Sequence, residues 1–234
     1  KKDLDSLLIT MATYPVNGIN TVILSAPQKN INPSYWLLKA VHEFFHIFQG
    51  TLRIVNPFTG INSKYNELNF PFDFQDEAVR AACRIEAEYI FNALKKESLT
   101  ASDSTLLPKV FADMRKVQKR IFGDSVNIKY KQWTEWQEGV AKFAEREIAL
   151  LSFENNTYIP SSEFLSKFGN TYLDTDFVNF YKGQLNPIRF VGVGVVGRTM
   201  FYYSGMGKAY ILNRLYPDWK NEYLKNNLDD LISK

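Results

Sequence analysis

The two histidines of this chain, His42 and His46, stand four residues apart in the segment VHEFFHIFQG. The surrounding residues 32–50 predict a helix, because Asn32 can cap its start and Pro33 suits the first helical position. Residues four apart on an α-helix lie about 40° apart around its axis and one turn apart along it. Both imidazoles therefore project from one face. Apolar residues occupy most of the remaining circumference, so we expect this helix to be buried.

Glu43 follows the first histidine and projects about 100° further round the helix. From there it can reach a metal-bound water without binding the metal, which is the mechanical basis of the H-E-x-x-H motif of zinc hydrolases. The alternative is two core histidines beside an unrelated glutamate, each needing a polar partner for its ring. The spacing favours a Zn²⁺ site with His42 and His46 as ligands and Glu43 as general base.

A catalytic zinc ion usually has three protein ligands and one water. The chain has no third histidine, so the third ligand must be a carboxylate. One candidate is Glu138, which lies in a helix predicted at residues 131–153. The alternatives are one glutamate in an irregular connection and three on a helix predicted at residues 74–96: Glu67, Glu77, Glu86 and Glu88.

The segment WQEGVAKFAE resembles the EG(L/F/V)A-x-Y/F helix that carries the third zinc ligand in gluzincins, a class of zinc peptidases. This resemblance implies that Glu138 is that ligand. Small residues beside it, Gly139 and Ala141, would let two metal-bearing helices approach closely. Several gluzincins have an acidic residue where this chain has Lys142, and Glu145 could serve in its place.

Two further segments resemble related proteins. YYSGMGKAYILNRLYPDWK is similar to a segment of several uncharacterised bacterial gluzincin-like proteins, and HEFFHIFQGTLRIVNP is similar to the motif helix of glycyl aminopeptidases. The resemblance implies a zinc-dependent peptidase acting on a peptide or protein substrate, with endo- or exo-action open. It also implies that Tyr202, Tyr203 or Arg198 could stabilise the oxyanion.

The length of 234 residues and the 45% hydrophobic content suit one domain, residues 1–234, with one sizeable core. We expect an α+β fold that is predominantly helical and zincin-like, with a small edge sheet. A β-branched run, Thr21–Leu24, predicts a strand that borders the cleft and could hold an extended peptide. Besides those named above, helices are predicted at 100–123, 161–169 and 174–183, with two more near the C-terminus.

Several features argue against other classes of protein. The net charge of +3 gives no reason to expect a nucleic-acid partner, and we interpret the basic residues of helix 100–123 as a solvated face. No apolar run reaches the length of a membrane span. Cys83 lies between apolar helix positions, which predicts a buried residue and not a nucleophile. The glycines of VGVGVVGR match a dinucleotide motif, but no strand follows them, so we expect a glycine-rich turn or strand beside the cleft: Gly192, Gly194 and Gly197.

A function of another class remains open at this point. A zinc-binding protein without catalytic activity could recognise a peptide or protein partner through the same cleft. The presence of Glu43 argues for the enzyme. The first ten residues lack the apolar core of a signal peptide and are typical of a mature N-terminus, so we expect an exported protein (periplasmic, cell-surface or secreted) more than a cytoplasmic one.

Overall fold

The computed structural model describes a predominantly helical protein with one small sheet, in agreement with the expected α+β class. The chain forms two compact units. The first comprises residues 1–53 and 144–184, and the second comprises 54–143 and 185–234. The single domain expected from the length stays a prediction. The described residues are 12–25, 33–51, 69–123, 125–155, 157, 159, 161–168, 179 and 182–234.

The first unit contains a β-hairpin made of β1 (Ala12–Val16) and β2 (Ile19–Ile23), which pair antiparallel. The two turn residues, Asn17 and Gly18, have φ angles of 51° and 79°. Positive φ at both positions is what a two-residue hairpin turn needs, and Asn-Gly is a preferred pair for it. The strand predicted at residues 21–24 therefore corresponds to β2, displaced by one or two residues. Its partner β1 was not predicted, although the Asn-Gly pair signals it.

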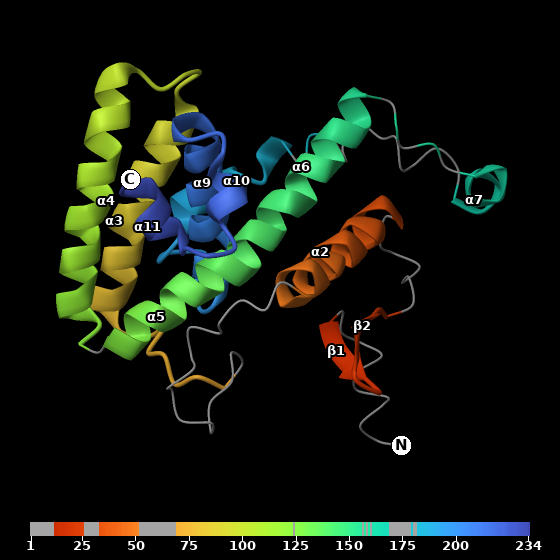
Figure 1. The fold of residues 1–234 in the computed structure, drawn as a ribbon, viewed down its shortest axis with the longest axis horizontal. Coiled ribbons are helices and arrows are strands. Elements are labelled where there is room, and N and C mark those ends of the chain that lie inside the picture. The colour runs from red at the N-terminus through yellow and green to blue at the C-terminus, as the bar shows by residue number, and fades with distance from the viewer. Residues whose placement is uncertain are drawn as a thin grey trace. The chain divides into compact units, whose positions relative to one another are not determined.

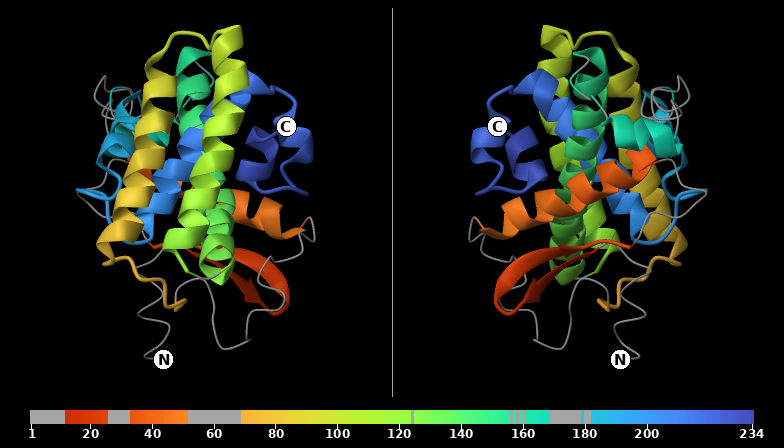
Figure 2. Two further views of the ribbon diagram at one scale, coloured as in Figure 1. Left: turned by 90° about the vertical axis from the view of Figure 1, so that its left-hand side faces the viewer. Right: turned by 90° about the vertical axis from the view of Figure 1, so that its right-hand side faces the viewer.

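Helix α2 (Pro33–Thr51) confirms the helix predicted at residues 32–50. The hairpin lies beside it in both views of Figure 2, and both strands contact it. The prediction that this helix is buried is wrong for part of its circumference. Leu38 is buried, but Phe44 and Phe48 are 58% and 47% exposed. Apolar residues occupy more than one face of α2, and the described elements cover only one.

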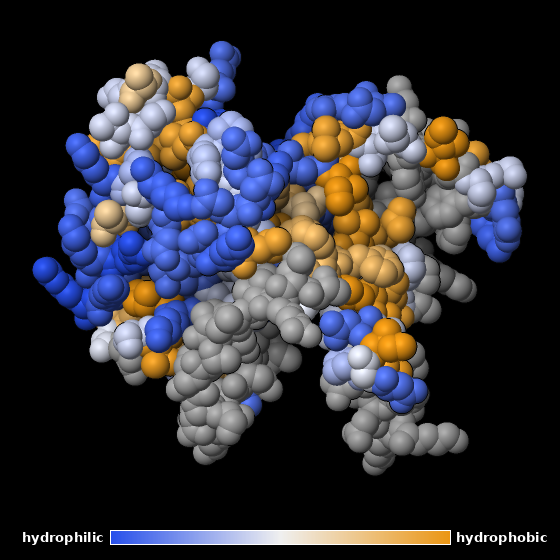
Figure 3. Space-filling model, viewed as in Figure 1, coloured by the Kyte–Doolittle hydropathy of each residue, from blue (hydrophilic) through white to orange (hydrophobic). Residues whose placement is uncertain are grey.

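The first unit also contains most of α6 (Val140–Glu154) and the short helix α7 (Ser162–Phe168). The lysine Lys39 of α2 pairs with Glu145 of α6 at 2.9 Å, so the two helices are in contact. Apolar surface is visible over α2 and the outer part of α6 in Figure 3. The helix predicted at 161–169 is confirmed. Most of the helix predicted at 174–183 falls outside the described part of the chain, and so does Glu67; the described residues 179, 182 and 183 are helical.

The second unit is built around α9 (Thr199–Leu215), whose inward side chains are fully buried. Helices α3 (Glu77–Lys95) and α4 (Ala101–Ile121) lie side by side in Figures 1 and 2, and α3 contacts α9. Both begin at capped residues, because Asp76 accepts from the Val79 amide and Thr100 forms a reciprocal pair with Asp103. The remaining elements of the unit are α5 (Ser125–Thr134), η1 (Glu135–Gly139), η3 (Asn186–Phe190), α10 (Trp219–Glu222) and α11 (Leu228–Ile232).

The helix predicted at residues 131–153 begins earlier and is not regular. α5, η1 and α6 follow one another without a break, and η1 is a π-helical turn. Such turns carry one residue more than an α-turn and occur often at functional sites. Sequence periodicity did not reveal it, since five residues of altered pitch are too few to shift a pattern of this length.

Two glycines allow α9 to pack directly on the π-turn. A Cβ atom at Gly205 would lie 2.4 Å from the carbonyl oxygen of Glu135, and one at Gly139 would lie 2.5 Å from the Cα of Gly205. Both neighbours are backbone atoms, so neither can move aside without displacing a helix. The contact therefore requires glycine at these positions.

We expect Gly205→Ala to lower the free energy of unfolding by about 1–3 kcal/mol or more, the usual cost of overpacking a core. Gly194→Ala is the control, because a Cβ atom there would meet only the Phe190 Cβ at an ordinary 3.6 Å. Chemical denaturation of both variants measures the difference. Equal stability of the two variants would show that the helices separate at low cost.

Three expectations about other residues can be compared with the structure. The glycine-rich segment forms a turn between η3 and α9, with φ angles of 78° at Gly192 and 69° at Gly197. Cys83 is 2% exposed, and burial raises the pKa of its thiol to about 12, so it is not a ready nucleophile.

The surface over α4 is mostly hydrophilic in Figure 3, and Arg115 there pairs with Asp230 at 2.5 Å. None of the described helices has the length and apolar character that crossing a membrane requires.

Candidate metal centre

Each histidine of α2 has an oxygen partner on the same ring nitrogen. His42 Nδ1 lies 3.3 Å from a carboxylate oxygen of Glu145, and His46 Nδ1 lies 2.7 Å from the side-chain oxygen of Gln49. Gln49 and Glu145 are 4% and 1% exposed, so both partners are fixed inside the protein. The Gln49 oxygen can only accept, so it places the proton of His46 on Nδ1 and leaves Nε2 as the nitrogen that a metal ion would take. The Glu145 carboxylate faces His42 Nδ1 at ion-pair distance, outside hydrogen-bond geometry.

The partner of His42 is itself held in place. The ammonium group of Lys39 donates to both carboxylate oxygens of Glu145, at 2.9 and 3.1 Å. Glu145 is the residue that could replace the acidic group expected at position 142, and the structure places it against a histidine. Lys142 lies elsewhere, with its ammonium group 5.3 Å from the ring centre of Tyr203.

Glu138 lies in the π-turn η1 and is 7% exposed. Arg198 donates from Nη2 to its Oε1 at 2.7 Å. The guanidinium group of Arg198 also lies 5.4 Å from the ring centre of Tyr202. Burial raises the pKa of the Tyr202 phenol well above its usual value, and the negative charge of Glu138 raises it further. Tyr202 therefore keeps its proton beside this carboxylate.

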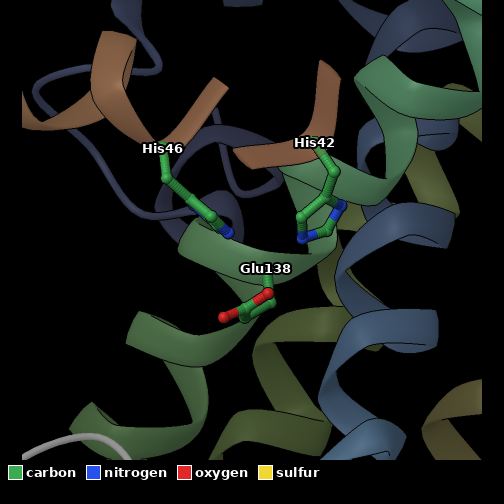
Figure 4. A group of neighbouring side chains, drawn as sticks. All are labelled: His42, His46 and Glu138. Carbon is green, nitrogen blue, oxygen red and sulfur yellow. The ribbon is translucent and has the colours of Figure 1, made fainter. Parts of the chain in front are cut away.

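Figure 4 shows the side chains of His42, His46 and Glu138 directed toward one another. One ligand atom from each lies within 4.8 Å of those of the other two. Two imidazole nitrogens and one carboxylate oxygen form a donor set that suits zinc and related divalent metals. These three residues thus form a group that could hold a metal ion, and the structure brings together the residues that the sequence suggested.

Helix geometry gives an independent reason for this arrangement. Glu138 precedes Glu145 by seven residues on the continuous stretch of η1 and α6. Seven residues are about two turns, so the two side chains project within about 20° of each other in a regular helix. Because Glu145 contacts His42, the same helical face presents Glu138 about two turns away.

The other proposed ligands have different surroundings. Glu86 is 2% exposed and pairs with the ammonium groups of Lys131 and Lys208, each at 2.9 Å. Glu77 and Glu88 lie on exposed positions of α3. Within the described part of the chain, His42, His46 and Glu138 form the group suited to a metal, and α3 contributes no residue to it.

Glu43 is half-buried and in contact with the hairpin. The hydroxyl group of Thr13 in β1 lies 2.9 Å from the Glu43 carbonyl oxygen and 3.3 Å from its carboxylate Oε2. The hydroxyl has one hydrogen and can donate to either oxygen. Sequence reasoning missed both Thr13 and Gln49. Thr13 is thirty residues from Glu43, so no local pattern marks it as a partner. Gln49 is three residues after His46 on the same helix, and that spacing could have revealed it.

We expect Glu138→Ala to weaken zinc binding far more than Glu88→Ala, because only the first removes an oxygen from the group. Glu88 is a suitable control since it is a glutamate on an exposed helical position. Competition with a zinc-sensitive dye would measure both affinities. Retention of wild-type affinity by Glu138→Ala would exclude Glu138 as the third ligand.

The relation to known proteins was tested by three comparisons. No protein family, curated protein or solved structure matches the chain. The likeness to gluzincins therefore rests on the motifs around His42 and Glu138 and on the C-terminal segment, together with the geometry of the three side chains.

Proposed function

We propose that this chain is a zinc-dependent peptidase with a zincin-like fold and a gluzincin-type metal site. The observation that carries the proposal is the meeting of His42, His46 and Glu138 within 4.8 Å. An oxygen partner at Nδ1 of each histidine supports it, since metal-binding histidines nearly always have one.

His42, His46 and Glu138 would hold the ion. Bound zinc would supply a lowered pKa for a water molecule and polarisation of a carbonyl group. The residues around the ligands hold them in place. Gln49 keeps the proton of the His46 ring on Nδ1, the Glu145 carboxylate faces Nδ1 of His42, and Arg198 donates to Glu138 at 2.7 Å.

Glu43 would act as the general base. It follows His42 directly, so its carboxylate projects from a neighbouring position on the same turn. It takes the proton of the attacking water and passes it to the leaving amine, a role that glutamate fills in many hydrolases. The hydroxyl group of Thr13 restricts where the carboxylate can move.

Tyr202 is the better supported of the two candidate tyrosines for stabilising an oxyanion. Its phenol can donate to an oxyanion, and it lies beside Glu138. Tyr203 instead lies against the ammonium group of Lys142. The substrate would be a peptide or protein. An extended segment of it could add to the β1–β2 hairpin, which contacts the helix bearing Glu43.

The alternative is a zinc-binding protein that recognises a partner without cleaving it. Incubation of zinc-loaded protein with a mixed peptide library, read by mass spectrometry, separates the two. We expect cleavage that stops on chelation and returns when zinc is added. A protein that binds one zinc per chain but cleaves nothing across a broad library would favour the binding protein.

A further inference from the structure

The second unit contains a cluster of charged side chains with almost no access to water. It joins α3, α5, η1, α9 and α11, and each member is at most 6% exposed. The metal centre uses none of them. We name this set the ionic cluster: Glu86, Lys131, Glu135, Lys208 and Asp229.

Two ammonium groups hold three carboxylates in this cluster. Lys208 Nζ lies 2.9 Å from Glu86, 2.8 Å from Glu135 and 2.6 Å from Asp229. Lys131 Nζ lies 2.9 Å from Glu86 and 2.7 Å from Glu135. Burying such groups is costly, and a buried ion pair often stabilises a protein no more than apolar residues would. A gain in stability therefore does not explain the ionic cluster well. A better explanation is that the cluster fixes the positions of the helices that carry its members.

Glu135 is the member that matters for the metal centre, because it is the first residue of the π-turn. Ser204 donates to its Oε1 at 2.6 Å, and Lys208 donates to its Oε2 at 2.8 Å. Its backbone is held as well, since Gly205 of α9 packs directly on its carbonyl oxygen. Both the side chain and the backbone of Glu135 are thus fixed to α9.

The π-turn makes its two buried glutamates, Glu135 and Glu138, point in different directions. On a regular α-helix, residues three apart lie on the same face. The extra residue of a π-turn rotates the next helical turn by about 100° relative to the turn before it. Glu135 can therefore enter the ionic cluster while Glu138 joins the two histidines.

We propose that the ionic cluster is the positioning element of the metal centre, in which Glu135, held by Ser204 and Lys208, fixes the π-turn and thereby the direction of Glu138. This inference rests on the proposed function, since it takes Glu138 as a metal ligand. Glu135 is a positioning residue, because its carboxylate is committed to the cluster and acts on the metal only through the turn.

The test compares two buried hydroxyl groups, Ser204 in α9 and Thr134 at the end of α5. Ser204→Ala removes the donor to Glu135. Thr134→Val is the control, because the Thr134 hydroxyl is fully buried but donates back to the Tyr130 carbonyl oxygen at 2.9 Å, away from the cluster. Glu135→Gln is a stronger variant, and Ser204→Ala keeps the test valid if that variant does not fold. Zn²⁺ affinity and hydrogen exchange of a peptide covering residues 135–143 are the two measurements.

Losing a direct partner of a metal ligand costs about 10–100-fold in affinity, and Ser204 lies one contact further out, so we expect Ser204→Ala to lower Zn²⁺ affinity by about 5–10-fold. Thr134→Val should stay within about 2-fold of the wild type, and only Ser204→Ala should speed exchange in the π-turn. Equal effects of both substitutions on affinity and exchange would overturn the inference. If the wild type binds no zinc, the proposed function fails, and exchange alone then decides whether the cluster holds the turn.

Discussion

Replacement of His42 or His46 with alanine should abolish tight zinc binding while the fold is retained. The wild type should bind about one zinc per chain, because two imidazoles and one carboxylate form one three-ligand site. Losing either imidazole leaves two protein ligands, and these cannot hold the ion against water and competing chelators. Elemental analysis after dialysis against a weak chelator measures the stoichiometry, and circular dichroism verifies the fold.

The loss of zinc affinity in the two histidine variants can be compared with the loss in Gln49→Ala. Gln49 is the oxygen partner of His46 at 2.7 Å and would not touch the metal. Loss of such a partner usually costs about 10–100-fold in affinity, so both histidine variants should lose more than that. Full zinc occupancy in His42→Ala or His46→Ala would show that the metal binds elsewhere in the chain.

The sequence predicted the elements whose signals are local. The histidine helix, α3, α4 and α7 lie within a few residues of their predicted bounds, since caps and apolar periodicity mark them. The histidine spacing also predicted the metal group, because four residues on a helix are enough to define a shared face. Glu138 came from a resemblance and not from physical reasoning, and the structure brings it to the histidines.

Most features that the sequence did not predict depend on contacts between distant parts of the chain. The π-turn is stabilised by Ser204 and Lys208, about seventy residues beyond Glu135, so no local pattern could reveal it. The exposed side chains of Phe44 and Phe48 were predicted to be buried, because composition shows how many apolar residues a helix has but not which of them meet a neighbour. The strand β1 is different, since the Asn-Gly pair could have revealed it.

The substitution Glu43→Gln should keep zinc and fold but remove hydrolysis. The amide is nearly the same size and can still accept from Thr13, whose hydroxyl lies 3.3 Å from the carboxylate oxygen. It cannot take a proton from the attacking water. Loss of a general base usually lowers the rate by about 10²–10⁴-fold, and we expect a fall in that range.

The matched control is Glu147→Gln, which changes a half-buried glutamate of α6 that lies 3.7 Å from the neighbouring Arg146. Initial rates on a peptide that the wild type cleaves should be unchanged in this variant and should fall only in Glu43→Gln. Zinc content measured in the same samples separates loss of the base from loss of the metal. Cleavage that survives Glu43→Gln at the wild-type rate would place the activity in another centre or in a contaminant. A variant that loses its zinc would instead show that Glu43 helps to hold the metal.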